Sequence, residues 1–236
     1  MDGAVSYLRA LLASGGSHRV VTLNLPMLGR AVQDDRFRSI VNSASLVTPD
    51  GMGVLLIGTI LGTRFLERVA GVDLIDRLCA LCAEDGWRVY LLGAAPGVAA
   101  SAADILQRRH PGLQVTGTHH GYFRSDEEPL VVGRIRAANP HLLLAALGSP
   151  RQEEWLVTHL QATAAVVGIG VGGSFDVYGG RTRLAPEWIR RVGLEWAYRL
   201  LREPRRWRVM ISLPFLVWLA VRERVKLELK KLTKRG

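Results

Sequence analysis

Residues 141–153 read HLLLAALGSPRQE, an apolar run followed directly by residues that begin a helix. The run has the length of a strand that is buried on both faces, and Pro150 suits the first position of a helix. Similar runs, each followed by a segment of helical period, recur at 19–25, 45–49, 87–93, 113–119 and 164–171. This alternation predicts an α/β fold with a mostly parallel sheet and helices on both of its faces.

Composition and charge divide the chain into two parts. It has 236 residues with 31 Lys+Arg against 21 Asp+Glu, which suits a globular domain with an appendage and excludes a disordered chain or a collagen. Residues 181–236 carry a formal charge of +11, whereas residues 1–180 carry −1. We therefore predict a catalytic core over 1–185 and a basic, helical C-terminal appendage over 186–236.

Neither a secretory signal nor a spanning helix is expected. The first residues, MDGAVSYLRALLASGG, lack the basic-then-apolar order of a signal peptide. The longest apolar stretch, 209–221, contains Ser212 and Pro214 and is well below the roughly 20 residues that cross a bilayer. These features predict a cytoplasmic protein without a spanning helix, and they allow a peripheral position on a membrane surface; the resemblance described below implies that this surface is the inner face of the cell membrane.

Chemistry is expected where the strands end, because an open Rossmann-like sheet binds ligands outside the carboxyl ends of its strands. The candidate positions are Asn24, the turn 48–51, the segment from Gly148 and the stretch 168–180. Asp50 lies in such a turn, where a carboxylate can act as a general base on a sugar hydroxyl. Pro-Asp-Gly is also ordinary turn chemistry, and spacing alone leaves both interpretations open.

The segment that starts at Gly148 also has two interpretations. The first interpretation is a capping box without further function. It would have Ser149 as the N-cap, Pro150 at the first helical position and Gln152 three residues after the cap. Arg151 is not needed for that cap, and it lies at a helix N-terminus, which attracts anions. We expect Gly148 and Arg151 to meet a phosphate-bearing ligand; a solvated arginine is the alternative.

Gly168, Gly170 and Gly173 match the nominal G-x-G-x-x-G dinucleotide fingerprint. An NAD(P)-binding oxidoreductase is therefore an alternative function. The fingerprint should open a helix, however, whereas residues 174–180 read as a loop.

Metal binding is not indicated. Cys79 and Cys82 lie on the apolar face of a predicted helix, and the chain has no other cysteine to complete a zinc site. We expect both thiols to pack in the core. No Asp-x-Asp pair is present to hold a divalent ion on a diphosphate. We predict no metal and no cofactor, with arginines meeting phosphate charge instead.

The C-terminal part alternates basic clusters with apolar residues. Apolar anchors flanked by cations suit an anionic membrane surface, and packing on the chain's own core is the alternative. No helix-turn-helix or zinc-finger spacing accompanies the charge, so we predict no nucleic-acid partner, although a basic nucleic-acid-binding protein remains a competing class. The arginines that begin this part are Arg199, Arg202, Arg205, Arg206 and Arg208.

Six motifs in register make the chain resemble the WecG/TagA/CpsF family of glycosyltransferases. This chain departs from the family's pattern at two positions. Leu184 stands before Ala185-Pro186, where the family commonly has an arginine, and Gly71-Val72 stands where the family usually has Gly-Ser. The motifs are VTLN (21–24), TPDGMG (48–53), ERVAGVDL (67–74), GSPRQE (148–153) with Trp155, GVGGSFD (170–176) and LEWAYRL (194–200).

The resemblance implies an inverting, metal-independent transfer of an N-acetylmannosamine-type sugar or related hexose. The implied donor is a UDP-sugar, and the implied acceptor is an undecaprenyl-diphosphate-linked sugar used in cell-surface polysaccharide or teichoic acid synthesis. By position, Asp50 resembles the catalytic base, and the five arginines resemble those that bind the lipid diphosphate. A homo-oligomer is left open. The predicted substrate-binding residues are Thr22, Asn24, Arg68, Gly148, Arg151, Gln152 and Asp176.

Overall fold

The chain forms a six-stranded, all-parallel sheet in the order β2-β1-β6-β5-β3-β4. The computed structural model describes residues 1–63, 65, 67–182, 185–186, 189, 198 and 207–233. Every strand overlaps one of the predicted apolar runs, so the predicted fold class is confirmed. The strands are β1 (His18–Leu23), β2 (Leu46–Pro49), β3 (Arg88–Gly93), β4 (Gln114–His119), β5 (Leu142–Ala146) and β6 (Val167–Gly170).

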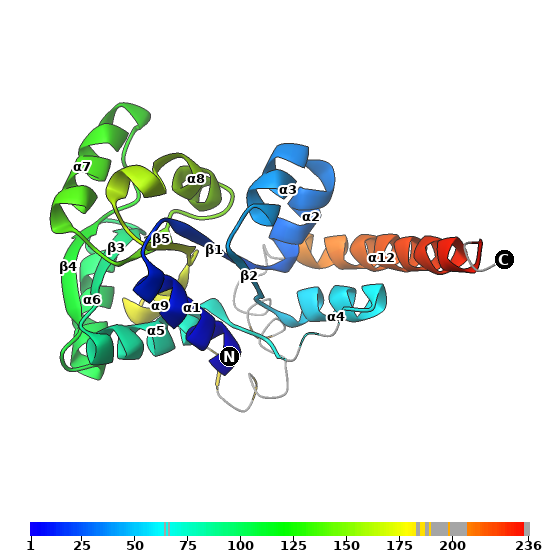
Figure 1. Cartoon of the computed structure of the whole chain (residues 1–236), viewed down its shortest axis with the longest axis horizontal. Helices are drawn as coiled ribbons and strands as arrows, with labels where there is room; N and C mark the ends of the chain where they lie inside the picture. Colours follow the sequence, from blue (N-terminus) through cyan, green and yellow to red (C-terminus); the bar gives the residue numbers. More distant parts are fainter. Residues whose placement is uncertain are drawn as a thin grey trace.

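Helices cover both faces of the sheet, because the central strands are apolar on both sides. On β5, Leu142 and Leu144 pack into the cluster formed with one helix group, while Leu143 and Ala145 pack into the cluster on the opposite face. Figure 1 shows the two groups on either side of the strands. The first group is α1 (Asp2–Ser14), α5 (Gly71–Asp85), α6 (Val98–Arg109) and α9 (Ser174–Tyr178). The second is α2 (Leu25–Gln33), α3 (Asp35–Asn42), α7 (Glu128–Ala138) and α8 (Arg151–Thr163), with the 3-10 helix η1 (Ser125–Glu127) before α7.

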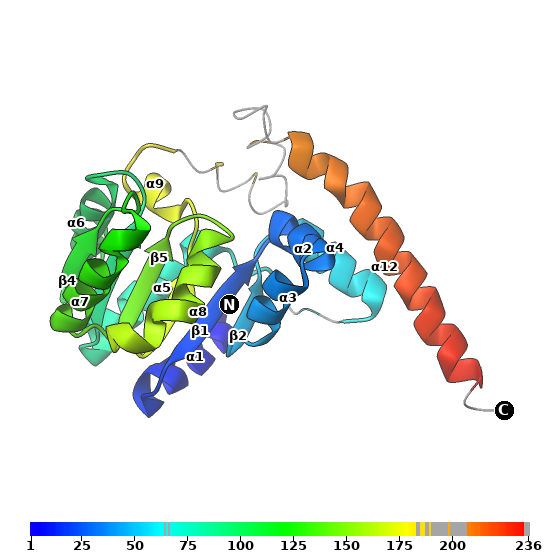
Figure 2. The same cartoon turned by 90° about the horizontal axis from the view of Figure 1, so that it is seen from above.

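Two further helices extend from the β2 edge of the body. The helix α12 (Trp207–Thr233) runs beside α4 (Met52–Leu61) and α2 and projects away from the sheet (Figure 2). Its buried side chains Leu216 and Ala220 pack on Ile57 of α4. Among the described residues, no helix has the length and hydropathy needed to cross a membrane. The predicted boundary near residue 185 falls where few residues are described, and it stays a prediction.

The structure confirms the prediction that both cysteines pack in the core. Cys79 and Cys82 are both fully buried on α5. Burial raises the pKa of the Cys79 thiol well above its ordinary value and that of Cys82 to about 12. Both groups are therefore packed thiols and not ligands or nucleophiles.

Packing explains Gly168, the first glycine of the nominal dinucleotide pattern. A Cβ on Gly168 would lie 2.6 Å from Leu160 Cδ1 and 2.8 Å from Leu156 Cδ2 of α8. The absence of a side chain on β6 therefore lets α8 pack directly on the strand. The segment after the pattern differs from the prediction, because Ser174–Tyr178 forms the short helix α9 where a loop was expected.

Replacing Gly168 by alanine is expected to destabilise the protein by about 1–3 kcal/mol, because the added methyl group overlaps two leucine side chains. Urea unfolding monitored by circular dichroism measures the change. Gly133→Ala is the matched control, since Gly133 is exposed on α7 and a Cβ there meets nothing within 4 Å. The free energy of unfolding of this control variant should equal that of the wild type or exceed it by up to about 1 kcal/mol, because alanine has a higher helix propensity than glycine. Equal unfolding midpoints for the two variants would contradict this packing explanation.

Candidate active site

Three side-chain oxygens from three separate elements meet around Gly71, at the carboxyl edge of the sheet. A Cβ on Gly71 would lie 3.7 Å from Asp50 Oδ2, 3.7 Å from Ser174 Oγ and 3.8 Å from Thr22 Oγ1. Asp50 follows β2, Thr22 belongs to β1, and Ser174 begins α9 after β6. Gly71 places no side chain between these oxygens. We place the candidate active site here.

Backbone and side-chain hydrogen bonds hold this arrangement. The Thr22 hydroxyl, which is buried, donates to Gly170 O at 2.9 Å and so joins the end of β1 to the end of β6. The Asp50 N–H donates to Leu23 O at 2.8 Å, which continues the pairing of β2 with β1 beyond Pro49. The sheet thus positions the main chain at Asp50.

The N-terminus of α5 provides positive electrostatic potential at the same place. The helix begins at Gly71 and has 15 residues, and Ala70 before it cannot cap it with a side chain. The N–H groups of a first helical turn have no acceptor inside the helix, and the aligned peptide dipoles add a partial positive charge. Negative charge that develops next to Gly71 is therefore stabilised by α5.

Thr48, the first residue of the candidate turn 48–51, adds a further polar group. It pairs with Thr22 in the register of β2 and β1, so the two side chains point to the same face of the sheet. Its side chain is buried, and its Oγ1 has no hydrogen-bond partner among the described residues. A buried hydroxyl without a partner is uncommon and marks a place where a ligand atom or water can bind.

Gln152 and Glu153 lie side by side at the start of α8, behind the end of β6. Both are buried, and Gln152 Nε2 donates to Glu153 Oε1 at 2.7 Å. Gln152 Oε1 accepts the N–H of Gly172 at 3.0 Å. Burial raises the pKa of Glu153 above its ordinary value. The predicted site residue Gln152 therefore supports the turn that leads to Ser174.

Arg151 binds a neighbouring loop in this structure. Its guanidinium donates to Gly121 O at 2.7 Å and Phe123 O at 3.0 Å, and it lies 4.6 Å from the centroid of the Phe123 ring. The predicted capping box is wrong, because α8 begins at Arg151 with Pro150 as N-cap and no side-chain cap. Gly148 is exposed at the end of β5. Phosphate binding by Gly148 and Arg151 stays a prediction.

The remaining predicted residues are dispersed. Asn24 caps α2, since its Oδ1 accepts the Met27 N–H at 3.1 Å. Arg68 is half-buried three residues before Gly71, and Asp176 lies in the first turn of α9. The tail arginines Arg199, Arg202, Arg205 and Arg206 lie outside the described residues; Arg208 is in α12, but its side chain is not described.

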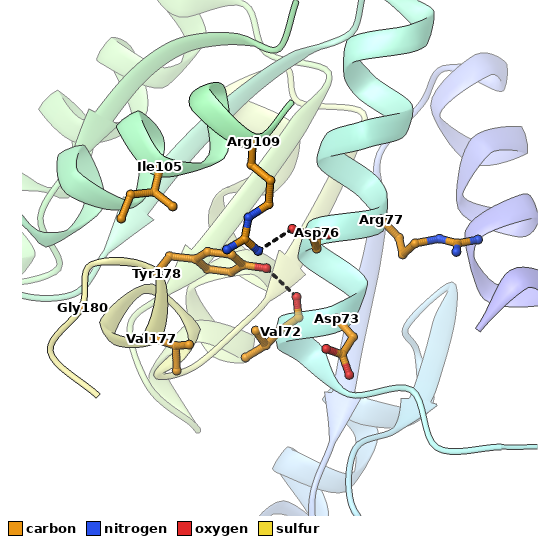
Figure 3. Close-up of a pocket in the computed structure, with 9 residues that line it drawn as sticks. All are labelled: Val72, Asp73, Asp76, Arg77, Ile105, Arg109, Val177, Tyr178 and Gly180. Carbon is orange, nitrogen blue, oxygen red and sulfur yellow. Dashed lines mark hydrogen bonds and ion pairs between the residues drawn. The ribbon is translucent and has the colours of Figure 1, made fainter. Parts of the chain in front are cut away.

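A pocket of about 560 Å³ is lined by residues of α5, α6 and α9 (Figure 3). Tyr178 crosses it and donates to Val72 O at 2.8 Å, while Arg109 pairs with Asp76 at 2.9 Å. None of the predicted site residues lines this pocket, although Val72 and Asp73, which do line it, directly follow Gly71. Within the described part of the chain, no cluster of three or more His, Cys, Asp or Glu side chains could hold a metal ion.

Comparison with known proteins agrees with the geometry. The family model described as glycosyl transferase WecG/TagA/CpsF family matches residues 1–230. A protein of Bacillus spizizenii named N-acetylglucosaminyldiphosphoundecaprenol N-acetyl-beta-D-mannosaminyltransferase is 36% identical over 195 residues, which are 83% of this chain and 75% of that protein. Two proteins of the same name also match. The one from Bacillus subtilis is 32% identical over 195 residues, with the same coverage. The one from Staphylococcus aureus strain MW2 is 31% identical over 212 residues, which are 90% of this chain and 83% of that protein. The chain therefore belongs to the WecG/TagA/CpsF family of glycosyltransferases.

Proposed function

We propose that this glycosyltransferase moves a hexose of the N-acetylmannosamine type from a UDP-sugar to an undecaprenyl-diphosphate-linked N-acetylglucosamine. The names of the relatives support the acceptor and the sugar type. The observation that carries the proposal is the convergence of Asp50, Thr22 and Ser174 beside the N-terminus of α5. That arrangement combines a carboxylate that can take a proton with a helix end that favours negative charge.

The proposed reaction is a single displacement that inverts the anomeric centre and uses no metal ion. The Asp50 carboxylate takes the proton of the acceptor hydroxyl as that oxygen forms a bond to the anomeric carbon of the donor. The bond between this carbon and the phosphate oxygen breaks, and UDP leaves with the electron pair. The N–H groups of α5 and the basic appendage are proposed to stabilise the charge on the phosphates.

The acceptor is proposed to arrive along α4 and α12. The helix α4 starts at Met52, two residues after Asp50, and it exposes Met52 and Leu56. Aromatic and aliphatic side chains on α12 are exposed as well, and the exposed cations Arg222 and Lys226 are interspersed with them along the helix. Apolar groups interleaved with cations bind anionic membrane surfaces, here proposed to be the inner face of the cell membrane. A lipid-linked sugar held there would lie next to the turn that carries Asp50.

The test is a product analysis with the full-length protein. The protein is incubated with each of a panel of UDP-sugars and a short-chain polyprenyl-diphosphate-N-acetylglucosamine, and products are identified by mass spectrometry. We expect a mass increase of one N-acetylhexosamine with UDP-N-acetylmannosamine, undiminished in EDTA. Transfer that stops in EDTA would contradict the metal-free route. Absence of transfer from every UDP-sugar would contradict the proposed function.

A further inference from the structure

Two consecutive polar side chains at the start of α8 are buried, although glutamine and glutamate in helices usually face the solvent. Gln152 and Glu153 are each 2% exposed. Among the described residues, no hydrogen bond of normal geometry reaches Glu153 Oε2, and the Ser149 side chain is the further polar neighbour of this carboxyl group. A buried carboxyl group with an unsatisfied oxygen lowers stability, so packing alone does not account for Glu153 at this position.

Glu153 determines which way the Gln152 amide faces. A primary amide has a donor end and an acceptor end, and here the donor end points to Glu153 Oε1 at 2.7 Å. The acceptor end is thereby directed to the Gly172 N–H at 3.0 Å. If the amide turned over, its NH₂ group would face the Gly172 N–H, and two donors would oppose each other. The carboxyl group therefore selects the one orientation that binds the turn.

The end of β6 is shaped to receive this pair. A Cβ on Gly170 would lie 2.7 Å from Gln152 Nε2 and 2.9 Å from Glu153 Oε1. Only a glycine leaves room for both side chains against the strand. The same residue accepts the hydrogen bond of the Thr22 hydroxyl. The pair thus contacts the backbone that joins Thr22 to the turn before α9.

The turn held by Gln152 carries one of the three oxygens of the site. Gly172 is followed by Gly173 and by Ser174, whose hydroxyl donates to Val171 O at 2.7 Å and faces the space at Gly71. Glycines in succession leave this turn few side-chain contacts of its own. The hydrogen bond from the Gly172 N–H to Gln152 is therefore one of the contacts that position this turn relative to Asp50, beside the Val171 N–H bond to Ala145 O at 2.9 Å.

We propose that Glu153 is a positioning residue for the transfer reaction: by orienting the Gln152 amide, it holds the Gly172–Ser174 turn where Ser174 and Thr22 face Asp50. This inference rests on the proposed function, since its readout is transfer. Glu153 does not touch the reacting atoms. Either ionisation state of its carboxyl group offers an oxygen that accepts from Gln152, so glutamine at this position is the conservative replacement.

The first experiment compares Glu153→Leu with Glu153→Gln in the full-length protein. We expect Glu153→Leu to lower kcat by about 10- to 100-fold, because small misplacements in an active site have effects of this size. Glu153→Gln should restore most of the rate. Thermal melting should change little in Glu153→Leu, because removing a buried carboxylate offsets the loss of the Gln152 partner. Glu154→Leu, at the next and less buried position of α8, is the control and should keep wild-type kcat.

The second experiment tests whether Glu153 acts through Gln152. In a double-mutant cycle, Glu153→Leu in a Gln152→Ala background should cause little further loss of kcat, because the amide that it orients is already absent. Additive losses would overturn the proposal. So would a Glu153→Leu protein with wild-type kcat, or one whose lost activity matches its unfolded fraction. If wild-type protein shows no transfer at all, the proposed function fails instead, so the two failures are distinguishable.

Discussion

Replacing Asp50 by asparagine is expected to lower kcat by about 10²–10⁴, the usual contribution of a positioned general base. The amide has nearly the same shape as the carboxylate but does not take a proton. The main chain at this position is held by the hydrogen bond from the Asp50 N–H to Leu23 O, so the turn should keep its structure. Steady-state transfer to a short-chain lipid acceptor measures the loss, and calorimetric titration should show UDP-sugar affinity close to wild type.

Asp126→Asn is the matched control for this prediction. Asp126 is an exposed aspartate in η1, paired with Arg124 on the surface, so its replacement should leave transfer unchanged. Wild-type turnover in the Asp50→Asn protein would exclude the base assignment. Loss of both turnover and UDP-sugar affinity would show instead that Asp50 binds the donor.

The sheet was predictable from the sequence because a buried parallel strand reads as a continuous apolar run. All six runs became strands, and the sequence also indicated the apolar face of α5 that carries Cys79 and Cys82. The strand order was not predictable. β6 pairs with β5, the strand before it in the chain, and also with β1, the first strand; this second pairing joins distant parts of the sequence, so no short pattern encodes it. The short helix α9 was missed because five residues are too few to show a helical period.

The candidate site was predictable only where a motif marks it. Asp50 follows from a strand end and from the family resemblance, and Thr22 follows from the resemblance alone. Ser174 lay in the candidate stretch 168–180 but was not singled out, and Gly71 was not identified, because their proximity to Asp50 and Thr22 depends on how the chain folds in three dimensions. Glu153 was missed for a related reason: a glutamate in a helix usually faces water, and here it is buried because Gly170 leaves room for it.

The exposed face of α12 has a composition that a purely structural helix does not need. Leu216 and Ala220 already pack it on α4. On other sides of the helix, Phe215 and Trp218 stack with ring centroids 6.2 Å apart, and the Arg222 guanidinium lies 5.1 Å from the Trp218 ring centroid. Figure 2 shows this helix at the opposite end of the molecule from α7. Exposed aromatic side chains with a cation packed against them are suited to the headgroup region of a bilayer.

Replacing both Phe215 and Trp218 by serine is expected to lower partitioning onto anionic vesicles by about 100-fold or more. Transfer of one large apolar side chain from water contributes about 1.5–3 kcal/mol, and 1.4 kcal/mol is a tenfold change in binding. The two side chains are 47% and 56% exposed, so the fold should be unaffected, which thermal melting checks. Sedimentation with vesicles of phosphatidylglycerol and phosphatidylcholine measures the partitioning.

The control for this experiment is the double variant Leu130→Ser and Val157→Ser. These residues are 59% and 45% exposed on α7 and α8, away from α12, and their replacement should leave vesicle binding unchanged. Raised salt should weaken the residual binding of the α12 variant further, because its remaining attraction comes from the basic side chains. If the Phe215 and Trp218 variant sediments with vesicles as well as wild type, α12 is not the membrane-facing element, and the proposed route of the lipid acceptor along α4 and α12 is wrong.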